Sequence, residues 1–366
     1  MALSRIKTNS IANDAVTSTK IAPNTVVASD IAALSIDSTK LASSAVTISK
    51  VDSTVTQLFG MRNRIINGDM RIDQRNAGAA VSVDGAEVYT LDRWKAVDGS
   101  DGVFSVQLDS SAPVGFNTSL KVTVTTADAS IGATQYAMVR QTIEGFNFAD
   151  FGFGTANAKT VTISFWVRSS LTGTFGGCLW NSNGGSPRCY PYTYTISAAN
   201  TWEQKSVTIA GDTTGTWTGA TSGSAAVVDF TLAMGSTYSG TAGAWAGSLY
   251  LAPTGVTQIM STNSATLYIT GVQLEASTQA TAFENRNIGT EFALCQRYFE
   301  TTYNYGTTIG TGLASGWASG TSSGGAPTRV DGYTFKVSKV RIILQSTQTI
   351  PNISKNTGKF FLISVS

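Results

Sequence analysis

The sequence has 366 residues, of which 42% are hydrophobic and only 13% are charged, and its 25 basic and 23 acidic side chains give a net charge of +2. This balance lacks the basic excess that marks a nucleic-acid-binding protein. No apolar run is long enough for a membrane-spanning helix, so we expect no membrane insertion. Histidine is absent, which excludes imidazole metal ligands and histidine-based catalytic triads.

The first sixty residues contain an aliphatic repeat with a period of ten, as in IANDAVTSTK IAPNTVVASD IAALSIDSTK. A period of ten fits neither a long helix nor a long strand, but it suits a short strand and turn that repeat. Two aliphatic side chains per unit contribute roughly 3–6 kcal/mol when buried. Ordering ten residues costs about 10–20 kcal/mol of backbone entropy. Because one copy cannot balance that cost, the segment is either disordered or wound together with other copies. We expect winding, because disordered segments are poorer in Ile and Val and keep no aliphatic register. Three chains suit a repeat that meets at one axis, although the sequence does not fix the number.

The predicted core positions of this stem recur in two slots, half a period apart. They are Ile11, Val16, Ile21, Val26, Ile31, Ile36, Leu41, Val46 and Val51. The pattern AVTSTKIA and IDSTKLASSAVTISKV resembles the stem repeats of bacteriophage tail fibres. That resemblance implies a homotrimer whose N-terminus docks on the virion tail or on an adaptor protein.

After residue 60 the sequence predicts strands separated by glycine-rich turns. The clearest predicted strands are KVTVTT (121–126), TVTISFWVR (160–168), YTYTIS (192–197), KSVTIA (205–210), AVVDFTLA (226–233) and ATLYITGVQLE (265–275). In TVTISFWVR the side chains of Val161, Ile163, Phe165 and Val167 alternate with polar ones, which indicates one buried face. We therefore predict a mainly β protein whose centre is a β-sandwich, with the jelly roll as the leading topology.

Three segments within 61–286 carry a second resemblance. The run NRIINGDMRIDQR resembles the opening of phage tail-fibre domains. The segments SFWVRS, NTWEQKSVTI and LYITGVQLE are similar, in this order, to those of jelly-roll carbohydrate-binding modules. The closing strand has Thr270 where such modules commonly carry an acidic residue. No calcium or ligand residue is therefore carried over, and we expect neither a metal nor a cofactor.

Loop aromatics flanked by small residues are candidate platforms for sugars, because a pyranose presents an apolar face ringed by hydroxyl groups. The candidates for glycan binding are Trp180, Asn181, Trp217, Tyr238 and Trp245. Packing over the core or against another subunit explains the same aromatics equally well. Trp94, Trp166 and Trp202 are expected to be packing residues at strand ends.

Catalysis is not predicted. Glycoside hydrolysis needs two carboxylates on opposite sides of one bond, and the acidic residues here are scattered. Asp69, Asp73, Asp92 and Asp229 are expected to form turns or to pair with Arg62, Arg71 and Arg93. Cys178 and Cys189 flank one turn and are either a disulfide or two small, partly buried thiols.

Residues 287–366 are predicted to form a short helix and a small β tip. The helix in NIGTEFALCQRYFE has Thr290 as its expected N-cap, Glu291 near its positive end, and Phe292, Cys295 and Tyr298 or Phe299 on one face. The run GTEFALCQRYF resembles the segment that follows the sandwich in phage fibres. The expected domains are thus a stem (1–60), a jelly-roll domain (61–286) and a helix with tip (287–366).

The expected function is that of a phage tail fibre that attaches to a glycan on the host surface. No signal peptide is recognised in MALSRIKTNS, as expected for a virion protein assembled in the host cytoplasm. Two alternatives stay open: a structural fibre of the virion head, neck or collar without a receptor, and a capsule depolymerase. The sequence names neither the host nor the glycan.

Overall fold

The computed structural model describes residues 61–182 and 186–301, together with Thr17, Thr19, Ile21 and two short strands near the C-terminus. The chain divides into two units, Met1–Phe59 and Gly60–Ser366. Of the predicted stem core, Ile21 is described and is 43% exposed. The other stem positions lie outside the described residues.

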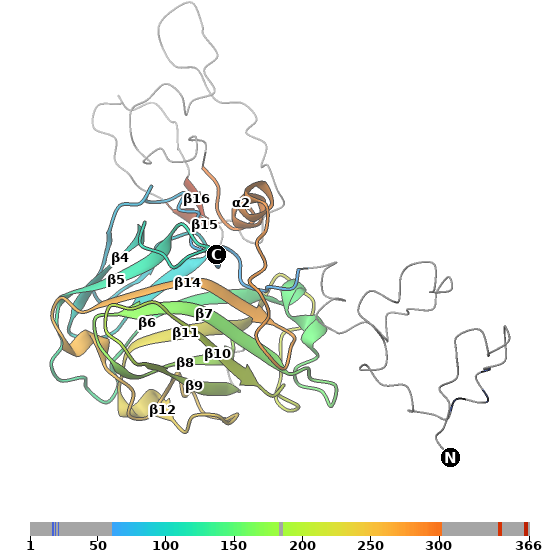
Figure 1. Ribbon diagram of the computed structural model, residues 1–366. Coiled ribbons are helices and arrows are strands. Elements are labelled where there is room, and N and C mark those ends of the chain that lie inside the picture. The colour runs from blue at the N-terminus through green and yellow to red at the C-terminus, as the bar shows by residue number, and fades with distance from the viewer. Residues whose placement is uncertain are drawn as a thin grey trace, which may run out of the picture. The chain divides into compact units, whose positions relative to one another are not determined.

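Gly60–Ser366 contains two six-stranded antiparallel sheets that pack face to face (Figure 1). The first sheet runs β1 (Val81–Val83), β4 (Val103–Asp109), β5 (Ser119–Thr126), β14 (Thr266–Glu275), β7 (Val161–Ser169) and β10 (Glu203–Ile209). The second sheet runs β2 (Glu87–Tyr89), β3 (Trp94–Asp98), β6 (Tyr136–Glu144), β11 (Ser224–Met234), β8 (Gly173–Asn181) and β9 (Cys189–Ile196). Consecutive strands repeatedly cross from one sheet to the other, as in jelly-roll sandwiches. The prediction of a mainly β sandwich is confirmed.

The remaining elements are short. They are η6 (Gly145–Asn147), η7 (Ala149–Phe151), η8 (Ser236–Tyr238), β12 (Ser239–Gly240), β13 (Ala252–Pro253), η9 (Ile259–Ser261), α2 (Ile288–Gln296), β15 (Ile343–Gln345) and β16 (Leu362–Ser364). β12 and β13 pair in parallel, and β15 pairs with β16 antiparallel. No helix in the described part of the chain is both long and apolar enough to cross a membrane.

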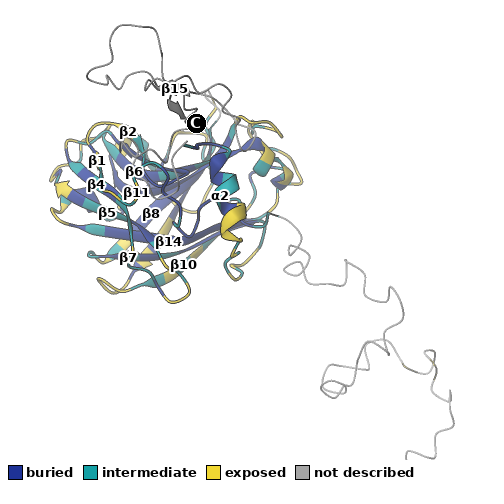
Figure 2. Cartoon of the chain, turned by 90° about the horizontal axis from the view of Figure 1, so that it is seen from above, coloured by how far each residue is buried: buried dark blue, intermediate teal, exposed yellow. Residues whose placement is uncertain are grey.

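The hydrophobic core lies between the two sheets, where Figure 2 shows the strands buried over most of their length. Each of the six predicted strands overlaps an observed one. The predicted buried face of β7 is confirmed, because Val161, Ile163, Phe165 and Val167 all belong to the core. Across the core, the Phe165 ring meets the Phe230 ring of β11 with 4.9 Å between centroids. The alternation of apolar and polar residues therefore predicted correctly which face of β7 lies in the core.

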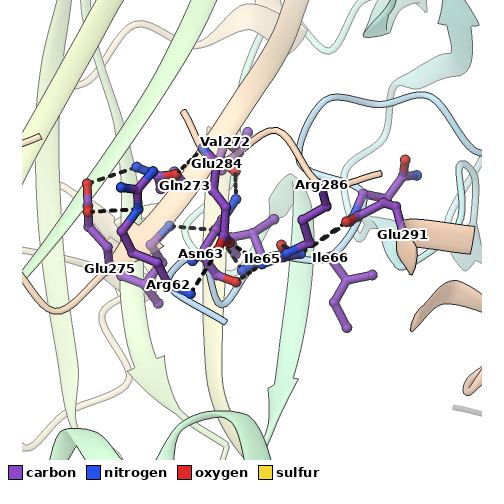
Figure 3. A network of polar contacts seen from close by, with 12 residues as sticks. Arg62, Asn63, Ile65, Ile66, Val272, Gln273, Glu275, Glu284, Arg286 and Glu291 are labelled. Carbon is purple, nitrogen blue, oxygen red and sulfur yellow. Dashed lines mark hydrogen bonds and ion pairs between the residues drawn. The ribbon is translucent and has the colours of Figure 1, made fainter. Parts of the chain in front are cut away.

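A polar network joins the segment that enters the sandwich to the segment that leaves it (Figure 3). Asn63 lies at its centre: its Nδ2 donates to the Val272 carbonyl (2.9 Å) and its Oδ1 accepts from the Leu274 amide (3.1 Å). Arg286 bridges two carboxylates, those of Glu284 (2.9 Å) and Glu291 (3.2 Å). The polar residues of NRIINGDM thus satisfy buried backbone groups that no sheet ladder reaches.

Helix α2 packs against this entry segment. Cys295 and Tyr298 are buried with Ile66 and Ile72, and Phe292 packs partly against them, which confirms the predicted apolar face. The expected cap is wrong: the helix begins at Ile288, and its N-cap, three residues before Thr290, is Asn287, whose Oδ1 accepts from the Gly289 amide (2.8 Å). Thr290 itself lies inside the helix. In the described chain α2 contacts the entry segment, through Ile66 and Ile72 and through Glu291, which accepts from the Asn67 amide. The region after residue 301 is described only at β15 and β16.

Candidate functional site

Strand register places a row of polar and aromatic side chains on the outer face of the second sheet. Tyr89 pairs with Lys95, Lys95 with Arg140, Arg140 with Asp229, and Asp229 with Cys178. Directly opposed residues of antiparallel strands point to the same face. The residues beside Asp229 in β11, Val228 and Phe230, belong to the core. The row therefore faces away from the core.

Three members of this face form one hydrogen-bonded unit, which we call the Trp180 unit: Trp180, Arg140 and Asp229. The Asp229 carboxylate accepts from Arg140 Nε (2.9 Å) and Nη2 (3.2 Å), and from the Trp180 indole Nε1 (2.8 Å). The Arg140 guanidinium carbon lies 5.5 Å from the Trp180 ring centroid. The unit fixes a partly exposed indole beside a partly exposed cation.

The carboxylate of the Trp180 unit is fully buried, whereas the Arg140 side chain is 12% exposed. Burial raises the pKa of Asp229, and the Arg140 charge and the Trp180 and Arg140 hydrogen bonds oppose that rise. Asp229 was expected to form a turn or to pair with Arg62, Arg71 or Arg93, but its partner is Arg140, which opposes it across two neighbouring strands. Asp229 acts as an anchor for the two side chains that cover it.

Lys95 extends the site toward β2. Its Nζ lies 2.5 Å from Glu87 Oε2 and 6.0 Å from the centroid of the Tyr89 ring. The Lys95 side chain is 22% exposed and that of Glu87 is 55% exposed. This end of the row therefore offers both a hydrogen-bond donor and an acceptor to the solvent.

An apolar cluster borders the Trp180 unit, and we call it the outer-face cluster. It consists of Val97, Met138, Cys178, Cys189, Met234, Leu251 and Ala252, with Tyr136, Trp180 and Tyr238 packed against it. The Tyr136 and Tyr238 rings meet edge to face at 5.8 Å. Of the five predicted glycan contacts, Trp180 and Tyr238 thus border the same cluster.

The two cysteines of the outer-face cluster are free thiols. Cys178 Sγ lies 3.3 Å from the Tyr250 carbonyl, and burial raises its pKa well above the usual value. The sequence left a disulfide and two partly buried thiols as alternatives for Cys178 and Cys189. The structure has two free thiols, and both are fully buried.

Trp217 and Trp245 lie elsewhere, in an aromatic cluster where loops cover the core. Their centroids are 5.6 Å apart, and both rings pack edge to face on Phe153. Their indole N–H groups are engaged within the protein, with Asp212 Oδ2 (3.1 Å) and the Ala210 carbonyl (2.7 Å). These contacts are those of a core cover, one of the two roles expected from sequence.

Asn181 is 1% exposed and holds the connection between β8 and β9. Its amide donates to the carbonyls of Ser186 (3.1 Å) and Thr216 (2.9 Å), and its Oδ1 accepts from the Arg188 amide (2.8 Å). The prediction that Asn181 contacts a glycan is therefore corrected, because its side-chain amide is buried and hydrogen-bonded to backbone groups of neighbouring loops.

Sequence reasoning missed Arg140 and Lys95. The alternation in YAMVRQTIE is a signal that puts Arg140 on the face opposite Val139, but no local signal joins it to Asp229, 89 residues away. Within residues 61–182 and 186–301, no group of three or more Cys, Asp or Glu side chains is placed to hold a metal ion. Thr270 is fully buried in this part of the chain.

No protein-family model matches the sequence, and no curated protein matches it. Among solved structures, it is similar to the enzymatically active domain of tailspike protein 4 of bacteriophage CBA120, with a TM-score of 0.32 and 14% identity over 59% of this chain. The match spans 21% of that tailspike chain.

Two carbohydrate-binding modules are also similar. The family 11 module from Clostridium thermocellum, solved with a mixed-linked tetrasaccharide, has a TM-score of 0.30 and 13% identity, covering 55% of this chain and 98% of that one. The CBM22-2 xylan-binding domain of Paenibacillus barcinonensis Xyn10C has a TM-score of 0.30 and 15% identity, covering 54% and 99%.

Proposed function

We propose that this chain is the glycan-binding protein of a bacteriophage fibre, and that it binds a saccharide on the outer face of the second sheet. The observation that carries the proposal is the Trp180 unit, in which Asp229 fixes an indole and a guanidinium side by side. A pyranose can place its apolar C–H face on the Trp180 ring while its hydroxyl groups bond to charged side chains.

The neighbouring residues suit that ligand. Lys95 and Glu87 supply a donor and an acceptor along the same face. Tyr238 packs against the outer-face cluster, as Trp180 does, and offers a second aromatic border. A face that combines aromatic rings with charged side chains favours hydroxyl-rich ligands over purely apolar ones.

The fibre part of the proposal rests on the stem repeat and its resemblance to phage fibres. Three chains joined by that stem would carry three copies of the site, and weak sugar contacts would then add through effective concentration. In this proposal the N-terminal segment docks on the tail, and the protein acts in the virion after assembly in the host cytoplasm. Sedimentation of the full-length chain tests the trimer.

Binding of the full-length chain to a glycan array, followed by calorimetry with each hit, tests the glycan site. We expect Trp180→Ala to weaken binding by at least about tenfold, because the platform is lost. Phe146→Ala is the matched control, since Phe146 is a 56% exposed aromatic outside this face. Absence of binding to any host glycan would favour the structural fibre, and release of oligosaccharides would favour the depolymerase.

A further inference from the structure

The outer face of the first sheet carries a second row of aromatic and cationic side chains. Lys121 of β5 pairs with Tyr268 of β14, and Tyr268 pairs with Arg168 of β7. Lys121 Nζ lies 5.5 Å, and the Arg168 guanidinium carbon 5.0 Å, from the centroid of the Tyr268 ring. Trp202 meets the same ring edge to face at 6.1 Å.

Trp166 belongs to this face as well. It precedes Arg168 by two positions in β7, so both side chains point the same way, about 6.6 Å apart along the strand. Trp166 and Trp202 are partly exposed, and neither belongs to a hydrophobic core cluster. The expectation that both are packing residues at strand ends is wrong for Trp166, which lies within β7 and faces outward.

A glycine backbone packs closely against the edge of the Trp166 ring. Gly271 has φ of +61°, and a Cβ there would lie 2.6 Å from Phe116 Cζ and 3.2 Å from Trp166 Cδ1. Phe116 in turn packs edge to face on Phe283 at 5.1 Å. Phe116 and Trp166 are therefore close-packed around residue 271, and this packing requires a glycine at that position.

The charges on this face do not balance. Lys121 pairs with Asp109 at 3.3 Å. Arg168 donates from Nη1 to the neutral Ser111 Oγ (2.9 Å), and within the described residues no carboxylate lies at ion-pair distance from it. Its Nε is buried without an acceptor in the same part of the chain. A guanidinium whose neighbours are neutral attracts a carboxylate, because a carboxylate can accept two parallel N–H bonds from it.

We propose that this face is a second saccharide site, selective for sugars that carry a carboxylate. The sugar ring lies on Trp166, with Trp202 as a further aromatic border, and its carboxylate accepts from Arg168, with Lys121 adding positive charge beyond Tyr268. The site goes beyond the function proposed above, because it uses the opposite sheet and none of the residues of the Trp180 unit.

Calorimetric titration of the full-length chain tests this site with hexagalacturonate as the acidic probe and its methyl ester as the neutral match. We expect hexagalacturonate to bind at least about tenfold more tightly than the ester, and the affinity to fall as NaCl is raised. Arg168→Gln and Trp166→Ala should each lose at least about tenfold in affinity, and Arg168→Lys should lose less because it keeps the charge.

Trp180→Ala is the control that separates the two sites, and it should leave hexagalacturonate binding unchanged. Equal affinity for the acid and the ester overturns the inference, as does loss of binding in Trp180→Ala but not in Arg168→Gln. An Arg168→Gln variant that changes the sedimenting mass also overturns it, because the face is then a contact between copies. Thermal melts monitored by circular dichroism check that every variant is folded.

Discussion

Gly68 lies where the entry segment comes closest to β14, and replacing it with alanine tests the account of this junction. The Gly68 carbonyl accepts from the Val272 amide at 2.9 Å, while the Val272 carbonyl accepts from Asn63 Nδ2 at 2.9 Å. A Cβ on residue 68 would lie 2.2 Å from the Val272 carbonyl oxygen, which is part of the backbone and cannot rotate away. The two segments must therefore separate.

The cost can be estimated from what that separation breaks. Overpacking at a close contact costs about 1–3 kcal/mol, and each of the two hydrogen bonds at Val272 contributes about 1 kcal/mol. We expect Gly68→Ala to lower the free energy of unfolding by about 3–5 kcal/mol, a large share of the usual stability of a domain.

Urea denaturation of the full-length protein, followed by tryptophan fluorescence, measures this change. Trp94 is a suitable reporter because it is buried and its Nε1 donates to the Asn67 carbonyl at 3.0 Å. Gly219→Ala is the matched control, since a Cβ there meets no atom within 4 Å. If the two variants unfold within about 0.5 kcal/mol of each other, the close approach at Val272 does not constrain the fold.

Three further outcomes are expected. Trp217→Ala should lower the free energy of unfolding by about 3–5 kcal/mol in a urea titration, because Trp217 stacks on Phe148 at 5.5 Å beneath the loops; a loss below about 1 kcal/mol would contradict its role as a core cover. Burial raises the pKa of Asp92 from 3.8 to about 6, so its contribution to stability is complete below pH 4 and is lost as the pH rises through 6. Relative to Asp92→Asn, the wild type should therefore lose about 2 kcal/mol between pH 4 and pH 7, and an unchanged difference would refute this. Cys178 and Cys295 are buried with raised pKa values, so both should react with a thiol reagent only at the rate of unfolding; fast labelling of the native protein would show that they are accessible.

The sequence predicted those parts of the fold that local patterns encode. The alternation in TVTISFWVR identified β7 and its buried face, because a strand places successive side chains on opposite sides. The apolar face of α2 was equally visible, but its cap was misplaced because Asn287 and Thr290 are both good capping residues. Local patterns thus predicted the presence and the buried face of a strand or helix better than the residue at which it begins.

The candidate site depends on contacts that no local pattern contains. Arg140 and Asp229 meet because β6 and β11 are neighbours in the second sheet, and the strand order is a property of the whole topology. Trp180 and Trp217 carry the same sequence signal, an aromatic among small residues. Only the approach of distant loops decides that Trp217 packs on Phe148 and Phe153, whereas Trp180 lies on a sheet face.

The network of Figure 3 has a mechanical consequence. The backbone amides of Arg62 and Asn63 donate to Glu284 at 3.2 and 2.9 Å, and the Arg64 amide donates to the Leu274 carbonyl at 2.9 Å. When the sandwich is held in place and tension is applied to the chain ahead of Met61, these bonds are loaded first, because they lie between Met61 and the strands of the sandwich. The strands that carry the aromatic faces then bear no tension until these hydrogen bonds break.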